Sequence, residues 1–229
     1  MPGKAMEGVR HMFDGVIFDM DGLMVDTEPV WMECWEPALA HFGYDVPPGL
    51  ADAVRGSAGD AASRILHKMV SPQLDTKAFW DYFSSLAEEI FSKGVKKKPG
   101  IDELLAYLGD KSVPCAVASS SSKKGIERNL RFIGALDRFD AIVPSSEVAH
   151  AKPAPDIFLE AARRLGTSPS HTMVLEDSFN GVRAGAAGGF FTVLVPDLVC
   201  PDDEIRSLTS RVCTSLFDVR DLLYHGEVG

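Results

Sequence analysis

Apolar residues along the chain follow two patterns that alternate. Short runs, several of them rich in β-branched residues, are separated by longer segments whose apolar positions recur with the period of a helix. This alternation is typical of a parallel sheet whose strands are joined by crossover helices, so it predicts an α/β fold. The expected strands are Val16–Asp19, Cys115–Ser119, Ala141–Pro144, Thr172–Glu176 and Phe191–Val195.

Single helices are expected between the later strands. Apolar residues at i, i+3, i+4 and i+7 predict one helix over Ile101–Leu108, with Gly109 as its terminator. The same spacing predicts another helix over Phe158–Leu165, with Gly166 just after its end. The last part of the chain is expected to add one edge strand and a helix around Leu216–Tyr224.

The segment between the first two expected strands is about 95 residues long, far more than a single crossover helix needs. It carries three amphipathic stripes, through Trp31–Phe42, Ala61–Met69 and Phe79–Phe91. Helices of this kind bury their apolar faces on one another, so we expect a small helical domain inserted into the α/β core. The predicted domains are a core of residues 12–29 and 96–229 and a helical domain of residues 30–95, with Lys96–Gly100 as the return linker.

Polar side chains follow the expected strands at their carboxyl ends. Asp19 and Asp21 close the first strand, Ser119–Ser122 the second, and Glu176–Asp177 the fourth. Lys152 lies in a proline-rich loop after the third strand. Because ligands of open parallel sheets bind beyond the carboxyl ends of the strands, we expect these side chains to form one site.

Carboxylates gathered in this way need a cation, because several of them cannot remain ionised together at close range. Their hard oxygens suit Mg²⁺, for which Asp19 and Asp177 are the candidate ligands, with Glu176 as a third candidate. Ser119 and Lys152 could then bind a phosphate group. One carboxylate could attack the phosphorus to form an aspartyl-phosphate while a second transfers a proton.

Each of these residues also has a purely structural explanation. The Asp19–Asp21 pair and Glu176–Asp177 could each place an acidic residue at the start of a helix, Ser119–Ser122 could supply helix caps, and Lys152 could be a surface lysine. Their joint occurrence at the ends of consecutive strands favours a shared catalytic site.

Composition narrows the class of partner. The net charge of −10, from 23 basic and 33 acidic residues, disfavours a nucleic acid bound through a broad basic face. Four scattered cysteines without CxxC spacing argue against a zinc site or a disulfide framework. No apolar run approaches the roughly 18–20 residues that span a bilayer, and the first residues lack an apolar signal core. We therefore expect a cytoplasmic protein with no membrane partner and no obligate protein partner.

Four motifs in order resemble those of the haloacid dehalogenase superfamily of aspartate-nucleophile phosphotransferases. They are Asp19-Met20-Asp21-Gly22, Ser119 after an apolar strand, Lys152 in Ala-Lys-Pro-Ala-Pro-Asp, and Glu176-Asp177 after another apolar strand. The resemblance covers nearly the whole chain. It implies a Rossmann-like parallel-sheet core, and it implies that the inserted helices form a cap domain that closes over the active site and selects substrates.

The resemblance also implies a role for each motif residue. Asp19 would be the nucleophile and Asp21 the acid/base, while Ser119, the adjacent Ser120, and Lys152 would bind phosphate. Mg²⁺ would be held by Asp19, the backbone carbonyl of Asp21, and Asp177, with Glu176 close by. The substrate would be a small phosphate monoester.

Within the superfamily, an aspartate two residues after the nucleophile marks phosphatases and phosphomutases, and Asp21 fills that position. The β-phosphoglucomutases that the chain resembles have a histidine where this chain has Trp31, and a cap arginine where Arg55-Gly56-Ser57-Ala58-Gly59 offers a glycine. These differences favour hydrolysis of a sugar phosphate or a nucleotide-like monoester, with a hexose-phosphate mutase as the alternative. Glu28, Trp31 and Arg55 are the candidate substrate contacts in the cap.

Two further classes fit less well. A signalling receiver module also uses Asp, Ser or Thr, Lys and Mg²⁺ at strand ends, but the nucleophile here lies on the first strand and a second aspartate follows it. A receiver would also have no use for the helical insertion. A calcium-binding EF-hand loop is disfavoured because Gly22 and Glu28 stand at the wrong offsets.

Overall fold

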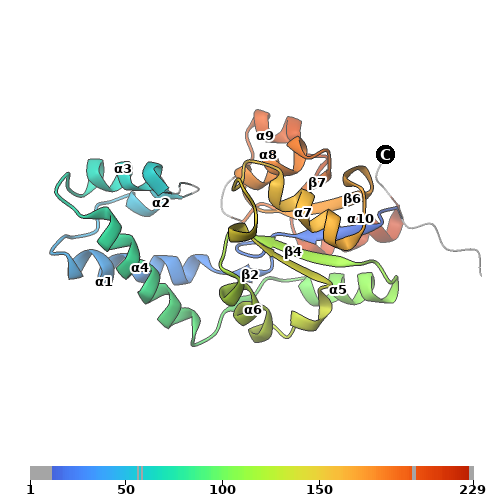
Figure 1. Ribbon diagram of the computed structural model, residues 1–229, viewed down its shortest axis with the longest axis horizontal. Coiled ribbons are helices and arrows are strands. Elements are labelled where there is room, and N and C mark those ends of the chain that lie inside the picture. Colours follow the sequence, from blue (N-terminus) through green and yellow to red (C-terminus); the bar gives the residue numbers. More distant parts are fainter. Residues whose placement is uncertain (1–11, 56, 58, 198–199, 227–229) are drawn as a thin grey trace, which may run out of the picture.

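The computed structural model describes residues 12–55, 57, 59–197 and 200–226, and its centre is a sheet of six strands that all run parallel (Figure 1). The spatial order is β5-β4-β1-β6-β7-β8. This confirms the α/β fold and all five expected strands to within one residue at each end. The strands are β1 (Gly15–Phe18), β4 (Cys115–Ser119), β5 (Ala141–Pro144), β6 (Thr172–Glu176), β7 (Phe191–Leu194) and β8 (Arg211–Val212).

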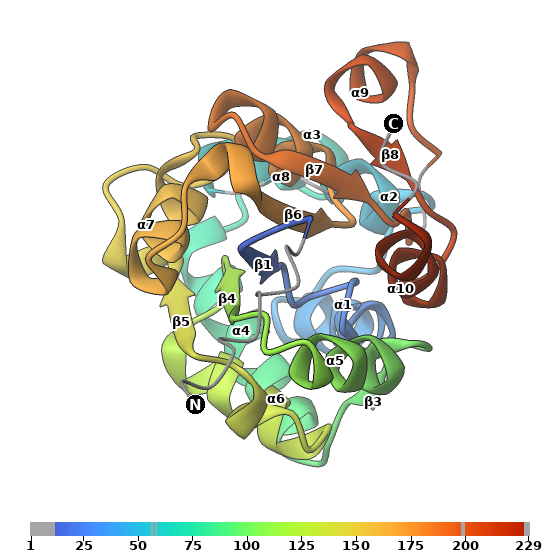
Figure 2. The same cartoon turned by 90° about the vertical axis from the view of Figure 1, so that its right-hand side faces the viewer.

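Helices cover both faces of this sheet (Figure 2). Side chains alternate along β1, so that Val16 and Phe18 pack into one layer of the core and Ile17 into the other. Among the described residues, none of the helices is both long and apolar enough to cross a membrane. The first layer is closed by α5 (Ile101–Asp110), α6 (Lys123–Phe132) and α10 (Leu216–His225), and the second by α7 (Asp156–Leu165), α8 (Phe179–Ala187) and α9 (Asp203–Leu208). Short 3₁₀ turns span Leu136–Arg138, Ser145–Glu147 and Pro169–His171.

The prediction that Gly109 terminates α5 is wrong, because the helix continues to Asp110. Arg138 explains the glycine. Its guanidinium donates to the carbonyl of Leu105, and a Cβ on Gly109 would lie 3.0 Å from Arg138 Nη2. The glycine therefore allows a close approach of side chain to helix. Gly166, by contrast, follows the last residue of α7 in the left-handed conformation at φ +71°, as expected.

The described residues between β2 and β3 form four helices that lie apart from the sheet (Figure 1). Their buried residues make a hydrophobic cluster of their own, rich in aromatic rings. Trp35, for example, lies 4.8 Å from Phe83 and 6.1 Å from Phe79, measured between ring centroids. Helix α2 was not expected from the sequence, whereas the other three follow the amphipathic stripes. The helices are α1 (Glu28–His41), α2 (Leu50–Val54), α3 (Gly59–Met69) and α4 (Thr76–Phe91).

The two crossings between these helices and the sheet lie side by side. Strands β2 (Val25–Asp26) and β3 (Lys96–Lys97) pair antiparallel, so the expected return linker is partly a strand. Lys98 extends the ribbon by donating its backbone N–H to the carbonyl of Met24 at 2.8 Å. Its side chain also ion-pairs with Asp197 at 2.6 Å, which ties the ribbon to the loop after β7.

Phe79 fills the centre of the helical cluster with none of its surface exposed, so its removal tests how far this cluster depends on its aromatic core. We expect Phe79→Ala to lower the free energy of unfolding by ~3–5 kcal/mol through loss of burial and creation of a cavity. Phe132→Ala, at a side chain that is 46% exposed, should change it by about 0.5 kcal/mol or less. Urea denaturation measures both, and equal losses would contradict the packing described here.

Candidate active site

Three polar residues end three adjacent strands at the same edge of the sheet. The register pairs Phe18 of β1 with Val117 of β4 and with Leu175 of β6, so Asp19 comes level with Glu176, and Ser119 lies one residue farther along β4. Asp19 follows β1 directly and donates its backbone N–H to the carbonyl of Leu175 at 2.9 Å. The residues brought together at this edge are Asp19, Ser119 and Glu176, all of which are buried.

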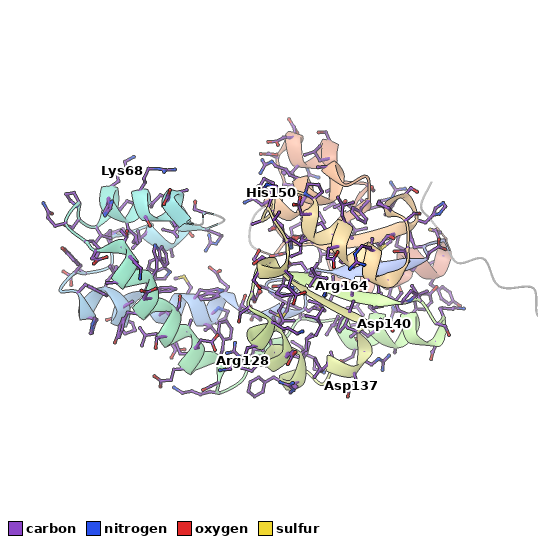
Figure 3. All side chains as sticks on the ribbon, in the orientation of Figure 1. Lys68, Arg128, Asp137, Asp140, His150 and Arg164 are labelled. Carbon is purple, nitrogen blue, oxygen red and sulfur yellow. The ribbon has the colours of Figure 1, made fainter. Side chains whose placement is uncertain are left out.

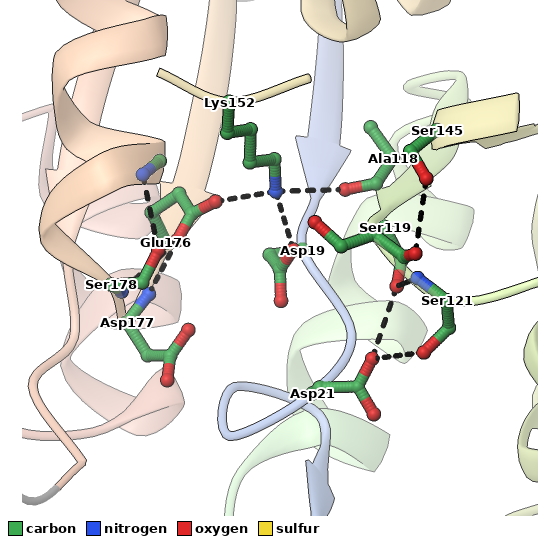
Figure 4. Close-up of polar contacts among 12 residues, drawn as sticks. Asp19, Asp21, Ala118, Ser119, Ser121, Ser145, Lys152, Glu176, Asp177 and Ser178 are labelled. Atoms are coloured by element: carbon green, nitrogen blue, oxygen red, sulfur yellow. Dashed lines mark hydrogen bonds and ion pairs between the residues drawn. The ribbon is translucent and has the colours of Figure 1, made fainter. Parts of the chain in front are cut away.

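Lys152 reaches this edge from the loop that precedes α7 (Figure 4). Its ammonium donates to Asp19 Oδ1 at 2.5 Å, to Glu176 Oε1 at 2.6 Å and to the carbonyl of Ala118 at 3.1 Å. These contacts use all three N–H donors of the ammonium. The Lys152 side chain is only 6% exposed, which excludes the alternative of a surface lysine.

Asp21 belongs to a second hydrogen-bonded group. Its Oδ2 accepts from the hydroxyl of Ser119 at 3.0 Å and from that of Ser121 at 2.8 Å. Ser121 was not among the predicted site residues, although it belongs to the Ser119–Ser122 run. The side chain of Ser120 has no such contact among the described residues, but its carbonyl accepts from Ser145.

The start of α8 supports the carboxylate of Glu176. Glu176 Oε2 accepts the backbone N–H groups of Asp177 at 3.1 Å and Ser178 at 3.0 Å, and the hydroxyl of Ser178 at 2.9 Å. The N-cap of α8 is Ser178, which accepts from the N–H of Gly181. The acidic pair is therefore not needed as the cap.

Carboxylate oxygens of Asp19, Glu176 and Asp177 lie within 4.8 Å of one another, so this group could hold a metal ion. A set of hard carboxylate ligands fits a hard divalent cation. Burial raises the pKa of Asp19 to about 7, since the charges of Glu176 and Asp21 reinforce it and Lys152 opposes it only in part. Burial, with the charges of Glu176 and Asp19, also raises the pKa of Asp177. A bound cation would relieve this repulsion.

The pKa of Lys152 is raised. Its burial acts against the charged form, but the charges of Asp19 and Glu176 outweigh that effect, so the ammonium stays charged. Burial raises the pKa of Asp21 as well, although hydrogen bonds from Ser121 and Ser119 lower it. A carboxyl group that holds its proton more readily is suited to act as a general acid.

Because they lack a side chain, two glycines make room for the carboxyl groups of Asp177 and Glu176. Gly22 has φ +84°, and a Cβ there would lie 2.1 Å from Asp177 Oδ2. A Cβ on Gly181 would lie 1.8 Å from the carboxyl group of Glu176. Both distances are shorter than any real contact, so the first motif and the start of α8 can meet only through glycine.

The candidate substrate contacts lie in the helical segment. Arg55 forms ion pairs with Glu28 and Asp52, both at 2.6 Å. Trp31 stacks on Phe83 at 6.2 Å with an interplanar angle of 7°. No hydrogen bond, ion pair or ring contact within the described ranges joins Glu28, Trp31 or Arg55 to the strand-end residues.

Comparison with known proteins identifies the family. A sequence profile of the haloacid dehalogenase-like hydrolases matches residues 16–195, a range that holds every strand-end residue described above. The chain belongs to this family, as its motifs indicated.

Individual relatives are similar over most of this chain. It is 34% identical over 218 residues to the bifunctional riboflavin kinase/FMN phosphatase of Arabidopsis thaliana. The aligned residues cover 93% of this chain but 56% of the relative, so the chain spans little more than half of that protein. It is 32% identical over 183 residues to fructose-1-phosphate phosphatase YqaB of Escherichia coli (strain K12), covering 79% of this chain and 95% of the relative. The crystal structure of CbbY from Rhodobacter sphaeroides in complex with phosphate is similar with a TM-score of 0.77 and 25% identity, covering 90% of this chain and 96% of that one.

Substitution of Gly22 tests the close approach of the first motif to Asp177. Gly43 is the matched control, because its φ is +80° but a Cβ there would meet nothing within 4 Å. We expect Gly43→Ala to cost ~1–2 kcal/mol from backbone strain alone, whereas Gly22→Ala should cost more and also weaken binding of a divalent cation. Urea denaturation and calorimetric titration measure these effects. Equal losses with unchanged cation binding would show that the clash does not exist.

The raised pKa of Asp19 makes a prediction for the metal-free protein. Because Asp19 titrates near 7 when folded and at its ordinary 3.8 when unfolded, the folded state keeps this proton longer. Stability from this group is therefore present at low pH and lost as the pH rises from about 4 to about 7. Melting temperatures with a chelator should fall over this range more in the wild type than in Asp19→Asn. Parallel curves for the two proteins would refute the shift.

Proposed function

We propose that the protein is a Mg²⁺-dependent phosphatase that hydrolyses a small phosphorylated metabolite, either a sugar phosphate or a nucleotide-like monoester. The observation that carries this proposal is a pair of aspartates whose carboxylates have different partners. Asp19 accepts a hydrogen bond from the ammonium of Lys152, and Asp21 accepts from the hydroxyls of two serines. Such a pair can divide the work of nucleophile and acid/base. The names of the Arabidopsis and E. coli relatives, an FMN phosphatase and a fructose-1-phosphate phosphatase, are in keeping with it.

Mg²⁺ would be held by the carboxylates of Asp19 and Asp177 and by the backbone carbonyl of Asp21, with Glu176 close by. The closeness of the acidic oxygens and their raised pKa values support this assignment. When bound, the ion supplies positive charge that lets a phosphate group approach these carboxylates. Ser119, Ser120 and Lys152 would bind the oxygens of that phosphate through hydroxyl and ammonium donors.

The reaction proceeds in two displacements at phosphorus. Asp19 attacks, and the bond from its Oδ to phosphorus forms as the bond to the leaving oxygen breaks, while Asp21 gives that oxygen a proton. The product is an aspartyl-phosphate. Asp21 then takes a proton from water, which attacks the phosphorus and releases inorganic phosphate and the free carboxylate of Asp19. Asp21 thus regains the proton that it lost.

Residues 30–95 would act as a cap over the core of residues 12–29 and 96–229, with Glu28, Trp31 and Arg55 as candidate substrate contacts. The separate hydrophobic cluster and the narrow β2–β3 ribbon support this division. The charge of Arg55 is already balanced by Glu28 and Asp52, so it is not a free cation for a second phosphate group. This favours a hydrolase for monoesters over a mutase that must grip two phosphates.

The substrate would be a free small molecule in the cytoplasm. The net charge of −10 opposes binding to nucleic acids and to anionic membrane surfaces. The proposed chemistry needs no protein partner, because the nucleophile, the acid/base and the phosphate-binding residues all come from this chain.

The experiment measures phosphate release from glucose 1-phosphate, glucose 6-phosphate, fructose 1-phosphate and a nucleotide, with Mg²⁺ and then with chelator. We expect metal-dependent release that falls by at least about 10³-fold in Asp19→Asn, the scale for loss of a catalytic nucleophile. Asp14→Asn is the matched control, because Asp14 precedes the same strand at its other end and its side chain is 61% exposed.

Two results would overturn the proposal. Full phosphate release by Asp19→Asn would remove the assigned nucleophile. Conversion of glucose 1-phosphate to glucose 6-phosphate, faster than phosphate release, would make the enzyme a hexose-phosphate mutase.

A further inference from the structure

Arg128 joins the helical segment to the part of the core that carries the serines. It lies on α6, which begins immediately after the Ser119–Ser122 loop and is capped by Ser122. Its side chain points away from α6 toward α4, and Figure 3 shows it between the two helices. Among the described residues, Arg128 is the cation of the core whose ion-pair partner belongs to helices α1–α4.

Three contacts fix the orientation of the Arg128 guanidinium. Its Nη1 pairs with Glu88 Oε2 at 2.5 Å, and its Cζ lies over the Phe91 ring, 5.0 Å from the ring centroid. Its Nε donates to the side-chain oxygen of Asn129 at 3.1 Å. Asn129 is itself only 2% exposed, and the Arg128 side chain is 17% exposed. Asn129 of α6 therefore orients the guanidinium while Glu88 and Phe91 of α4 bind it.

The contact falls at the base of the helical segment. Phe91 is the last residue of α4, a few residues before β3, and its ring meets the ring of Trp31 edge to face at 5.3 Å. Trp31 lies in the first turn of α1, just after β2. Arg128 thus touches the point where the chain enters and leaves the helices, whereas α3 extends away from the core (Figure 1).

We propose that Arg128 is a positioning residue that holds the base of the cap against α6, so that the cap turns about this point and Arg55, which pairs with Glu28 at the start of α1, stays at a fixed distance from the phosphate-binding serines. The catalytic consequence rests on the proposed phosphatase function, but the mechanical one does not. A lysine could not replace Arg128, because it lacks both the Nε donor and the flat face that covers Phe91.

The chain offers matched controls on the same helix and on the partner helix. Arg131 is the next arginine of α6 but pairs with Glu127 of that helix at 3.1 Å and is 60% exposed. Glu88 is 53% exposed, so Glu88→Gln breaks the ion pair from the other side without disturbing a core. The charge exchange Arg128→Glu with Glu88→Arg restores attraction with the groups reversed.

Spin labels report the cap position without reference to activity. We would place them at Lys68→Cys on α3 and Asp137→Cys on the core, both labelled in Figure 3, in a Cys200→Ser background. Cys34, Cys115 and Cys213 are buried and so are poor targets for the label. Pulsed electron–electron double resonance then gives the distribution of distances between the two spin labels, and so between cap and core, for each variant.

Arg128→Gln, Arg128→Lys and Glu88→Gln should each broaden this distribution, while Arg131→Gln leaves it unchanged. The charge exchange should give a narrower distribution than Arg128→Glu alone, because it restores the ion pair but not the contacts with Asn129 and Phe91. In the phosphatase assay we expect KM to rise about fivefold in Arg128→Gln with kcat within about twofold, the scale of one partly buried ion pair and cation–π contact.

An Arg128→Gln distribution as narrow as the wild type would overturn the proposal, and so would equal broadening in Arg131→Gln. A charge exchange with a distribution as broad as that of Arg128→Glu alone would also refute the Arg128–Glu88 link. If no phosphate is released by any variant, the proposed function fails, and the distances alone decide the role of Arg128.

Discussion

The ammonium of Lys152 is the interaction on which the rest of this site depends. Buried carboxylates at the end of a sheet are costly unless a cation shares their charge. Lys152 does so for Asp19 and Glu176 at once, and the loop before α7 brings it there. The carboxyl group of Asp21 instead accepts from two serine hydroxyls, and burial raises the pKa of both Asp21 and Asp177. The parallel register makes this possible, because it brings Asp19 level with Glu176 at the carboxyl ends of neighbouring strands.

Much of the fold could be predicted because local pattern and tertiary role agree. The strands of the sheet centre are buried on both faces, so they are near-continuous apolar runs that the sequence displays directly. The strand-end residues could be grouped from topology alone, since parallel strands present their carboxyl ends together. The family comparison and the six-stranded sheet bear out this level of inference, from the class of fold to the class of enzyme.

The remainder depends on contacts between distant segments. Gly109 has the local features of a terminator, yet its absent side chain makes room for Arg138. Ser121 stood in a run of four serines, and only the path of the loop decides which hydroxyls reach Asp21. Arg128 and Arg131 are three residues apart on α6, but Arg128 pairs with Glu88 of α4 and Arg131 with Glu127 of its own helix. No single-segment pattern carries this information.

The β2–β3 ribbon has a consequence for how such a protein can change over time. Asp26 and Lys96 are register partners, so the chain departs from the α/β unit and returns to it at neighbouring points. A module inserted there adds little loop-closure entropy to the folding of its host, whatever its own length. Selection can therefore exchange or remodel α1–α4 while β1, β4 and β6 keep their register. The sheet with its strand-end residues and the helices α1–α4 are in this sense separately heritable.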